Sequence, residues 1–171
     1  MKTKTKYMLM AGIVAIAIAV DLISKQLFSD ITYTRIIPYI IAFQTNGGNT
    51  GAAFGIFSKS TTFLIAISIV IVLCLIGVDL MLKIKSKTYT IGFGLILGGA
   101  VGNFVDRIAL GYVRDFIMFD FWHSFPIFNF ADCCIVIGAI LVCIHFIFLS
   151  KSKDDLNSNQ DKSKVDKNGN N

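Results

Sequence analysis

Four long apolar segments limit what this chain can fold into. They cover approximately residues 7–28, 61–82, 89–110 and 130–149 of 171. A helix needs roughly 20 mostly apolar residues to cross the hydrocarbon core of a bilayer, because each residue advances it by about 1.5 Å. All four segments reach that length, and 54% of the chain is hydrophobic. The sequence therefore predicts an all-α membrane protein with four transmembrane helices.

The lysines indicate how these helices cross the membrane. They precede the first segment, separate the second from the third and follow the fourth: Lys2, Lys4, Lys6, Lys83, Lys85, Lys87, Lys151 and Lys153. Cytoplasmic connections carry an excess of Lys and Arg, so we expect both termini in the cytoplasm and residues 29–60 and 111–129 outside. The formal charge of +5 is dispersed over these ends, so we expect no nucleic-acid partner.

The first apolar segment has a second interpretation. Its lysine-rich start, apolar run and Ala17-Ile18-Ala19 resemble a secretory signal with a cleavage site. Charged Asp21 and Lys25 follow immediately, and cleavage would leave three spans whose orientation disagrees with the later lysines. We therefore expect a retained membrane helix, and the mass of the intact protein distinguishes the two interpretations.

The loops and the end of the chain differ in composition. Residues 31–43 are rich in β-branched and aromatic side chains, and a turn signal at 46–48 precedes another such run at 52–57, which predicts a small extracytoplasmic β-sheet. Residues 112–128 contain Trp122 and five phenylalanines, so we expect an interfacial aromatic loop in the headgroup layer. Residues 151–171 are strongly polar and predict a disordered cytoplasmic tail.

Polar residues within membrane spans are candidates for a functional site, because burying them unpaired is costly. The expected topology gathers many of them near the outer interface: Asp21, Lys25, Asn103, Asp106, Arg107, Asp115, Asn129 and Asp132. Each also has a structural explanation. Asp21 and Lys25 can form an i,i+4 ion pair, and Asn129 can cap a helix with Asp132 in its first turn. At the inner side, Asp79 is interpreted as an ordinary pair with Lys83.

The residue types restrict the chemistry of such a site. No His-Glu-x-x-His is present, and His123 and His145 stand apart, so we expect no metal site. Paired aspartates remain. Two neighbouring carboxyl groups share one proton, so that one can deprotonate a water while the other protonates a carbonyl oxygen. A small proton- or ion-coupled transporter is the alternative function, although neither a midplane site nor an inverted repeat is visible. A non-catalytic assembly factor is a third.

Five sequence blocks resemble those of the lipoprotein signal peptidase family, also called signal peptidase II. They are Asp21-Leu-Ile-Ser-Lys25, Asn49-Thr-Gly-Ala-Ala-Phe-Gly55, Gly102-Asn-Phe-Val-Asp-Arg107, Val113-Arg-Asp-Phe116 and Phe128-Asn-Phe-Ala-Asp132. The similarity covers about residues 8–149 and excludes the tail. It implies an enzyme of the bacterial plasma membrane that cuts prolipoproteins on the N-terminal side of a diacylglyceryl-modified cysteine, without metal or cofactor.

The resemblance also implies roles for particular residues. Asp115 and Asp132 would form the catalytic pair of an aspartic endopeptidase at the outer face. The supporting positions would be Asn103, Arg107 and Asn129 lining the site, Asp21 and Lys25 as a structural pair, and Asn49 reaching toward the substrate. We expect a monomer whose partners are prolipoprotein signal peptides and membrane lipids.

Overall fold

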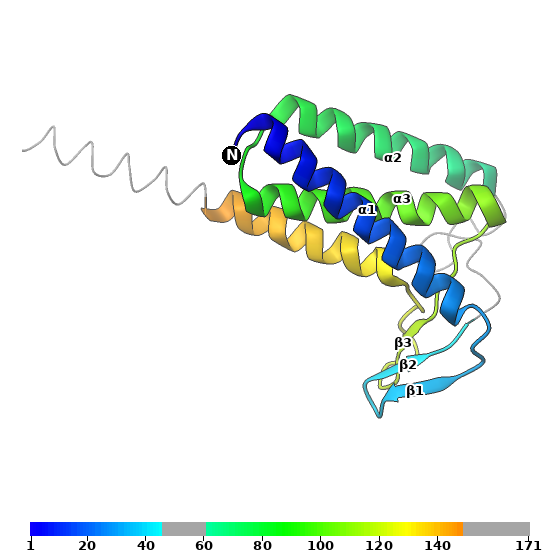
Figure 1. The fold of residues 1–171 in the computed structure, drawn as a ribbon. Helices are drawn as coiled ribbons and strands as arrows, with labels where there is room; N and C mark the ends of the chain where they lie inside the picture. Colours follow the sequence, from blue (N-terminus) through cyan, green and yellow to red (C-terminus); the bar gives the residue numbers. More distant parts are fainter. Residues whose placement is uncertain (46–60, 149–171) are drawn as a thin grey trace, which may run out of the picture.

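The computed structural model describes residues 1–45 and 61–148. Its helices are α1 (Thr3–Phe28), α2 (Thr61–Leu82), α3 (Lys87–Leu110) and a fourth helix, Phe130–Phe148. All four are long and apolar enough to cross a membrane, which confirms the predicted spans. The helices alternate in direction along the chain (Figure 1). The predicted tail, 151–171, lies outside the described residues and stays a prediction.

Helix α3 is the centre of the bundle because it contacts the other three helices. It packs against α1 and α2, and its glycines let two neighbours approach closely. A Cβ added at Gly102 would lie 2.5 Å from Oδ2 of Asp21 on α1, and one at Gly92 would lie 2.8 Å from the carbonyl of Gly138 on the fourth helix. Small residues bring membrane helices into such contact. The bundle therefore places α1 and the fourth helix against α3.

A three-stranded antiparallel sheet lies at the end of the bundle where α1 ends and the fourth helix begins (Figure 1). It comprises β1 (Thr34–Ile37), β2 (Ile41–Phe43) and β3 (Ile117–Phe119) in that order. The first two strands form a hairpin whose turn contains Tyr39 in a left-handed conformation, with φ 62°. The predicted sheet is confirmed in its first two strands.

The third strand comes from a different part of the chain than expected. Residues 46–48 and 52–57, predicted to continue the sheet, lie outside the described residues. Instead Ile117–Phe119, from the predicted aromatic loop, pairs with β2, so that Ala42 lies opposite Met118. The rest of that loop is an aromatic cluster in which Phe121 and Trp122 are exposed. Its placement in the headgroup layer stays a prediction.

The interpretation of Asp79 was wrong about its partner. Oδ1 of Asp79 lies 2.7 Å from Nζ of Lys6, and both side chains are buried. Lys83 follows the last residue of α2 and has a positive φ of 49°, so it leaves the helical path on which an i,i+4 pair depends. The pair therefore joins α1 to α2 at the end of the bundle opposite to the sheet.

Candidate active site

The end of the bundle next to the sheet brings most of the predicted site residues into one hydrogen-bonded network. The members are Asp21, Lys25, Asn103, Asp106, Asp115, Asn129 and Asp132. They come from the end of α1, the end of α3, the loop 111–116 and the start of the fourth helix. Asn49 lies outside the described residues, and Arg107 stands beside the network.

Asn129 connects the two candidate catalytic aspartates. Its Nδ2 donates to Oδ1 of Asp115 over 2.6 Å, and its Oδ1 accepts from the backbone N–H of Asp132 over 3.0 Å. The backbone N–H of Asn129 in turn donates to Oδ2 of Asp132 over 3.2 Å. These reciprocal bonds are those of a capping box and confirm the N-cap interpretation. One residue, with 0% exposure, thus holds both carboxyl groups.

Asn103 extends the network from Asp132 to α1. Its Nδ2 donates to Oδ1 of Asp132 over 2.8 Å, and its Oδ1 accepts from Nζ of Lys25 over 2.9 Å. The same oxygen accepts from Nδ2 of Asn129 over 3.1 Å. Both oxygens of Asp132 therefore accept N–H bonds, one from Asn103 and one from the backbone of Asn129.

Lys25 is fully buried and lies between two carboxylates. Its Nζ is 2.7 Å from Oδ2 of Asp21 and 3.5 Å from Oδ2 of Asp106. The other oxygen of Asp21 accepts from the backbone N–H of Ala131 over 2.9 Å. A buried charge requires such pairing, because its desolvation is otherwise uncompensated. The predicted i,i+4 pair is present, and it also fastens the first turn of the fourth helix to α1.

Arg107 lies on the side of α3 that faces α2. Its Nη1 is 3.5 Å from Oγ of Ser68 on α2, at the long limit of a hydrogen bond. Among the nearby charges, the carboxylate of Asp132 attracts its guanidinium most strongly, followed by that of Asp115. Within the described part of the chain, its buried Nε has no hydrogen-bond partner. The guanidinium therefore brings positive charge to the aspartates with donor capacity to spare.

Sequence reasoning gave no role to Arg114, which follows Asp106 by eight residues and directly precedes Asp115. Nη2 of Arg114 lies 2.7 Å from Oδ1 of Asp106, and the hydrogen bond to this carboxylate raises the pKa of Arg114 above its usual value. The signal that could have revealed Arg114 was its position beside a candidate catalytic residue.

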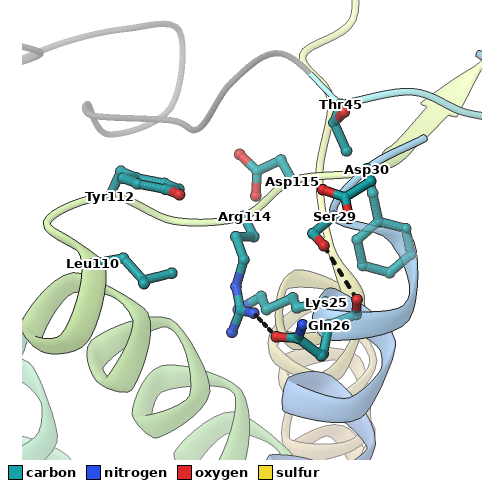
Figure 2. Close-up of a pocket in the computed structure, with 10 residues that line it drawn as sticks. Lys25, Gln26, Ser29, Asp30, Thr45, Leu110, Tyr112, Arg114 and Asp115 are labelled. Carbon is teal, nitrogen blue, oxygen red and sulfur yellow. Dashed lines mark hydrogen bonds between the residues drawn. The ribbon is translucent and has the colours of Figure 1, made fainter. Parts of the chain in front are cut away.

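Two cavities border the aspartates. A cavity of about 310 Å³ is lined largely by polar and charged side chains, including Lys25, Arg114 and Asp115 (Figure 2). A second, of about 360 Å³, is lined by aromatic and aliphatic side chains together with Asp132: Phe119, Phe125, Phe128, Cys133, Val136 and Ile137. Asp115 thus borders a polar cavity and Asp132 an apolar one.

Across residues 1–45 and 61–148, no group of three or more His, Cys, Asp or Glu side chains could hold a metal ion.

Comparison with known proteins identifies the family. The model of signal peptidase (SPase) II, Peptidase_A8, matches residues 13–148. The chain belongs to the signal peptidase II family. A lipoprotein signal peptidase of Symbiobacterium thermophilum is 33% identical over 84% of this chain and 97% of its own length. Another, of Lactobacillus johnsonii, is 40% identical over 68% of this chain and 74% of its own length.

Two solved structures of bacterial membrane enzymes are similar to this chain. A bacterial membrane enzyme solved by the in meso method at 2.3 Å resolution has a TM-score of 0.76 and 29% identity, covering 88% of this chain and 92% of its own. A second, at 1.9 Å, has a TM-score of 0.71 and 30% identity, covering 84% and 93%. The chain is therefore a multi-pass membrane peptidase, and the comparisons do not support the alternative of a small transporter.

Proposed function

We propose that this protein is an aspartic endopeptidase that removes the signal peptide from diacylglyceryl-modified prolipoproteins. It cuts on the N-terminal side of the lipidated cysteine and uses Asp115 and Asp132 as its catalytic pair. The observation that carries the proposal is that both carboxyl groups accept hydrogen bonds from one buried residue, Asn129, between a polar and an apolar cavity.

The hydrogen bonds of Asp132 suit it to the role of the base. An ionised carboxylate only accepts hydrogen bonds, and both oxygens of Asp132 accept them. We assign to Asp132 the removal of a proton from water and to Asp115 the donation of a proton to the scissile carbonyl oxygen. The resulting hydroxide adds to the carbonyl carbon. When the C–N bond breaks, Asp132 gives its proton to the leaving amine, and Asp115 takes back a proton from the hydroxyl as the new carboxyl group forms. Asn103 and Asn129 hold the pair in place, and Arg107 adds positive charge beside it.

The cavities support a substrate that is partly apolar. The side of the site at Asp132 opens onto the Phe119, Phe125 and Phe128 rings, which suit lipid chains or an apolar signal segment. The side at Asp115 suits the polar main chain that follows the cysteine. We assign the protein to the bacterial plasma membrane as a monomer, with both termini cytoplasmic and this site at the outer face, as the distribution of lysines favours.

The test is cleavage of a diacylglyceryl prolipoprotein by the purified protein, followed by mass spectrometry. Asp115→Asn and Asp132→Asn each keep the shape of the side chain but lose its acid-base function, so each should abolish cleavage while the protein still inserts. Asp120→Asn removes an acid at the end of β3, outside the network, and should retain cleavage. Full activity of either site variant rejects the aspartic pair as the catalytic group and favours a non-catalytic assembly role for the protein. Loss of activity with a chelator contradicts a metal-free reaction.

A further inference from the structure

Arg114 is a charged residue whose contacts the proposed reaction leaves unexplained. It lies in the loop between α3 and β3 and immediately precedes Asp115. In Figure 2 its side chain extends from the loop toward Gln26 at the end of α1, and the carboxyl of Asp115 leaves the loop on another side. The two neighbours therefore point to different parts of the site.

One carboxylate of α3 holds both the side chain and the main chain of Arg114. Nη2 donates to Oδ1 of Asp106 over 2.7 Å, and Nε donates to Oδ2 over 3.3 Å. The backbone N–H of Arg114 also donates to Oδ2, over 3.0 Å. Asp106 is almost fully buried and the Arg114 side chain is 18% exposed, so water screens this pair little. The planar guanidinium matches the carboxylate in a way that the single ammonium of lysine cannot.

The same guanidinium reaches α1. Its Nη1 donates to Oε1 of Gln26 over 3.2 Å, and Gln26 follows Lys25, which lies 3.5 Å from Asp106. Arg114 therefore fixes the loop to α3 and α1 together. On the other side of Asp115, the backbone N–H of Phe116 donates to the carbonyl of Phe128 over 3.0 Å. The main chain of Asp115 is thus held from both neighbours.

We propose that Arg114 is a positioning residue for peptide cleavage, which sets the main chain of Asp115 relative to Asp132 through Asp106 and Gln26. This inference rests on the proposed function of the two aspartates. Arg114 need not touch the substrate for this role. Its absence would leave the carboxyl of Asp115 in the site but free to depart from the geometry that transfers a proton, and a displacement of about 1 Å can cost roughly 100-fold in rate.

The test compares kcat and KM for a diacylglyceryl prolipoprotein across four variants. Arg114→Gln should lower kcat by about 10- to 100-fold with KM within about threefold, because orientation fails and substrate binding does not. Arg114→Lys keeps the positive charge but lacks the planar guanidinium that matches the carboxylate, so it should recover only part of kcat. Gln26→Ala removes one attachment and should cause the smallest loss of the three. Arg35→Gln is the matched control, because Arg35 also pairs with an aspartate, Asp120, but is largely exposed on β1.

Several outcomes overturn the inference. One is an Arg114→Gln variant with kcat within twofold of the wild type; another is a rise in KM with unchanged kcat, which indicates substrate contact. A third is an equal loss in Arg35→Gln, which makes the effect one of charge in general. Thermal unfolding in detergent is measured for each variant. If the fall in kcat is absent at temperatures below the onset of unfolding, the loss comes from instability, and positioning is contradicted. Asp115→Asn separates the two proposals: if it cleaves like the wild type, the proposed function itself fails, whatever Arg114 does.

Discussion

Helix α1 carries two buried lysine–aspartate pairs, one at each end of the bundle, and they differ in what surrounds them. At the end where α1 begins, named the inner end after the predicted topology, Lys6 meets Asp79 over 2.7 Å, and the rings of Tyr7 and Tyr89 lie 5.0 and 5.6 Å from its Nζ. At the end next to the sheet, named the outer end in the same way, Lys25 meets Asp21 over the same distance. The first pair is enclosed by aromatic rings, whereas the second continues into amides and further carboxylates.

The difference shows that a buried ion pair is not by itself a sign of chemistry. The Lys25 ammonium reaches Asn103, and through it Asp132, whose carboxyl borders a cavity. The Lys6 ammonium joins α1 to α2 through its hydrogen bond to Asp79. What distinguishes the outer pair is a path of hydrogen bonds to groups that a substrate can reach. Substitutions at the two ends should therefore separate cleavage from stability.

The largest effect is expected for Lys25→Met. It leaves Asp21 and Asp106 buried with less compensating charge, and removing one partner of a buried pair costs about 3–5 kcal/mol. Cleavage should fall below detection, because Asn103 also loses the donor that orients its oxygen. Unfolding in detergent and prolipoprotein cleavage measure the two losses. Lys6→Met is the matched control: it should lose similar stability yet keep kcat within about twofold below its unfolding temperature. A comparable loss of kcat there would contradict the comparison.

Asn129→Ala is expected to have the next largest effect on cleavage. It removes the amide between Asp115 and Asp132 and the cap of the fourth helix. Loss of an N-cap costs typically about 1 kcal/mol, whereas loss of orientation at a catalytic group can cost roughly 100-fold in rate. The two roles can be distinguished with Asn129→Ser, which keeps a capping oxygen but cannot donate as an amide does. If Ser restores stability and cleavage alike, Asn129 serves as a cap only.

The sequence predicts the outer site better than the inner pair, and the reason is physical. Span length and lysine position fix which ends of the helices meet, so the gathering of Asn103, Asn129 and Asp132 follows without any knowledge of side-chain contacts. The capping box is local and equally readable. In contrast, the partner of Asp79 depends on how α1 approaches α2, and an i,i+4 rule selected Lys83 instead of Lys6.

The outer sheet illustrates the same limit. Residues 34–43 form a hairpin that local composition predicts. The strand Ile117–Phe119 is three residues long, and its pairing with β2 spans more than seventy residues of sequence, so no local pattern reveals it. The contacts of Arg114 were missed for a related reason. Its partners lie on α1 and α3, and only the folded chain brings Gln26 and Asp106 to the same guanidinium.

A smaller effect is expected at Asp120, the acid of the outer sheet that lies outside the network. Its carboxylate accepts from the hydroxyl of Tyr33 over 2.6 Å and lies 3.2 Å from Nε of Arg35. The hydrogen bond from Tyr33, together with the charge of Arg35, holds the pKa of Asp120 below its ordinary value of 3.8. The stabilisation is therefore fully present above that value and is lost as pH falls through the lower pKa of the folded protein. Unfolding of the wild type and of Asp120→Asn should differ at pH 7 and converge in acid. A difference independent of pH would contradict this assignment.

The smallest effect is expected when both partners of the inner pair are replaced, as in Lys6→Met with Asp79→Leu. Removing both charges removes both desolvation costs, and apolar side chains of similar size in place of a buried ion pair are often neutral or stabilising. Unfolding should therefore return close to that of the wild type, with cleavage unchanged. The same exchange at Asp21 and Lys25 cannot be neutral, because Asp21 also accepts from the backbone of Ala131 and Lys25 donates to Asn103. If the outer double replacement also kept stability and cleavage, the network would be dispensable, and the distinction between the two ends of α1 would be lost.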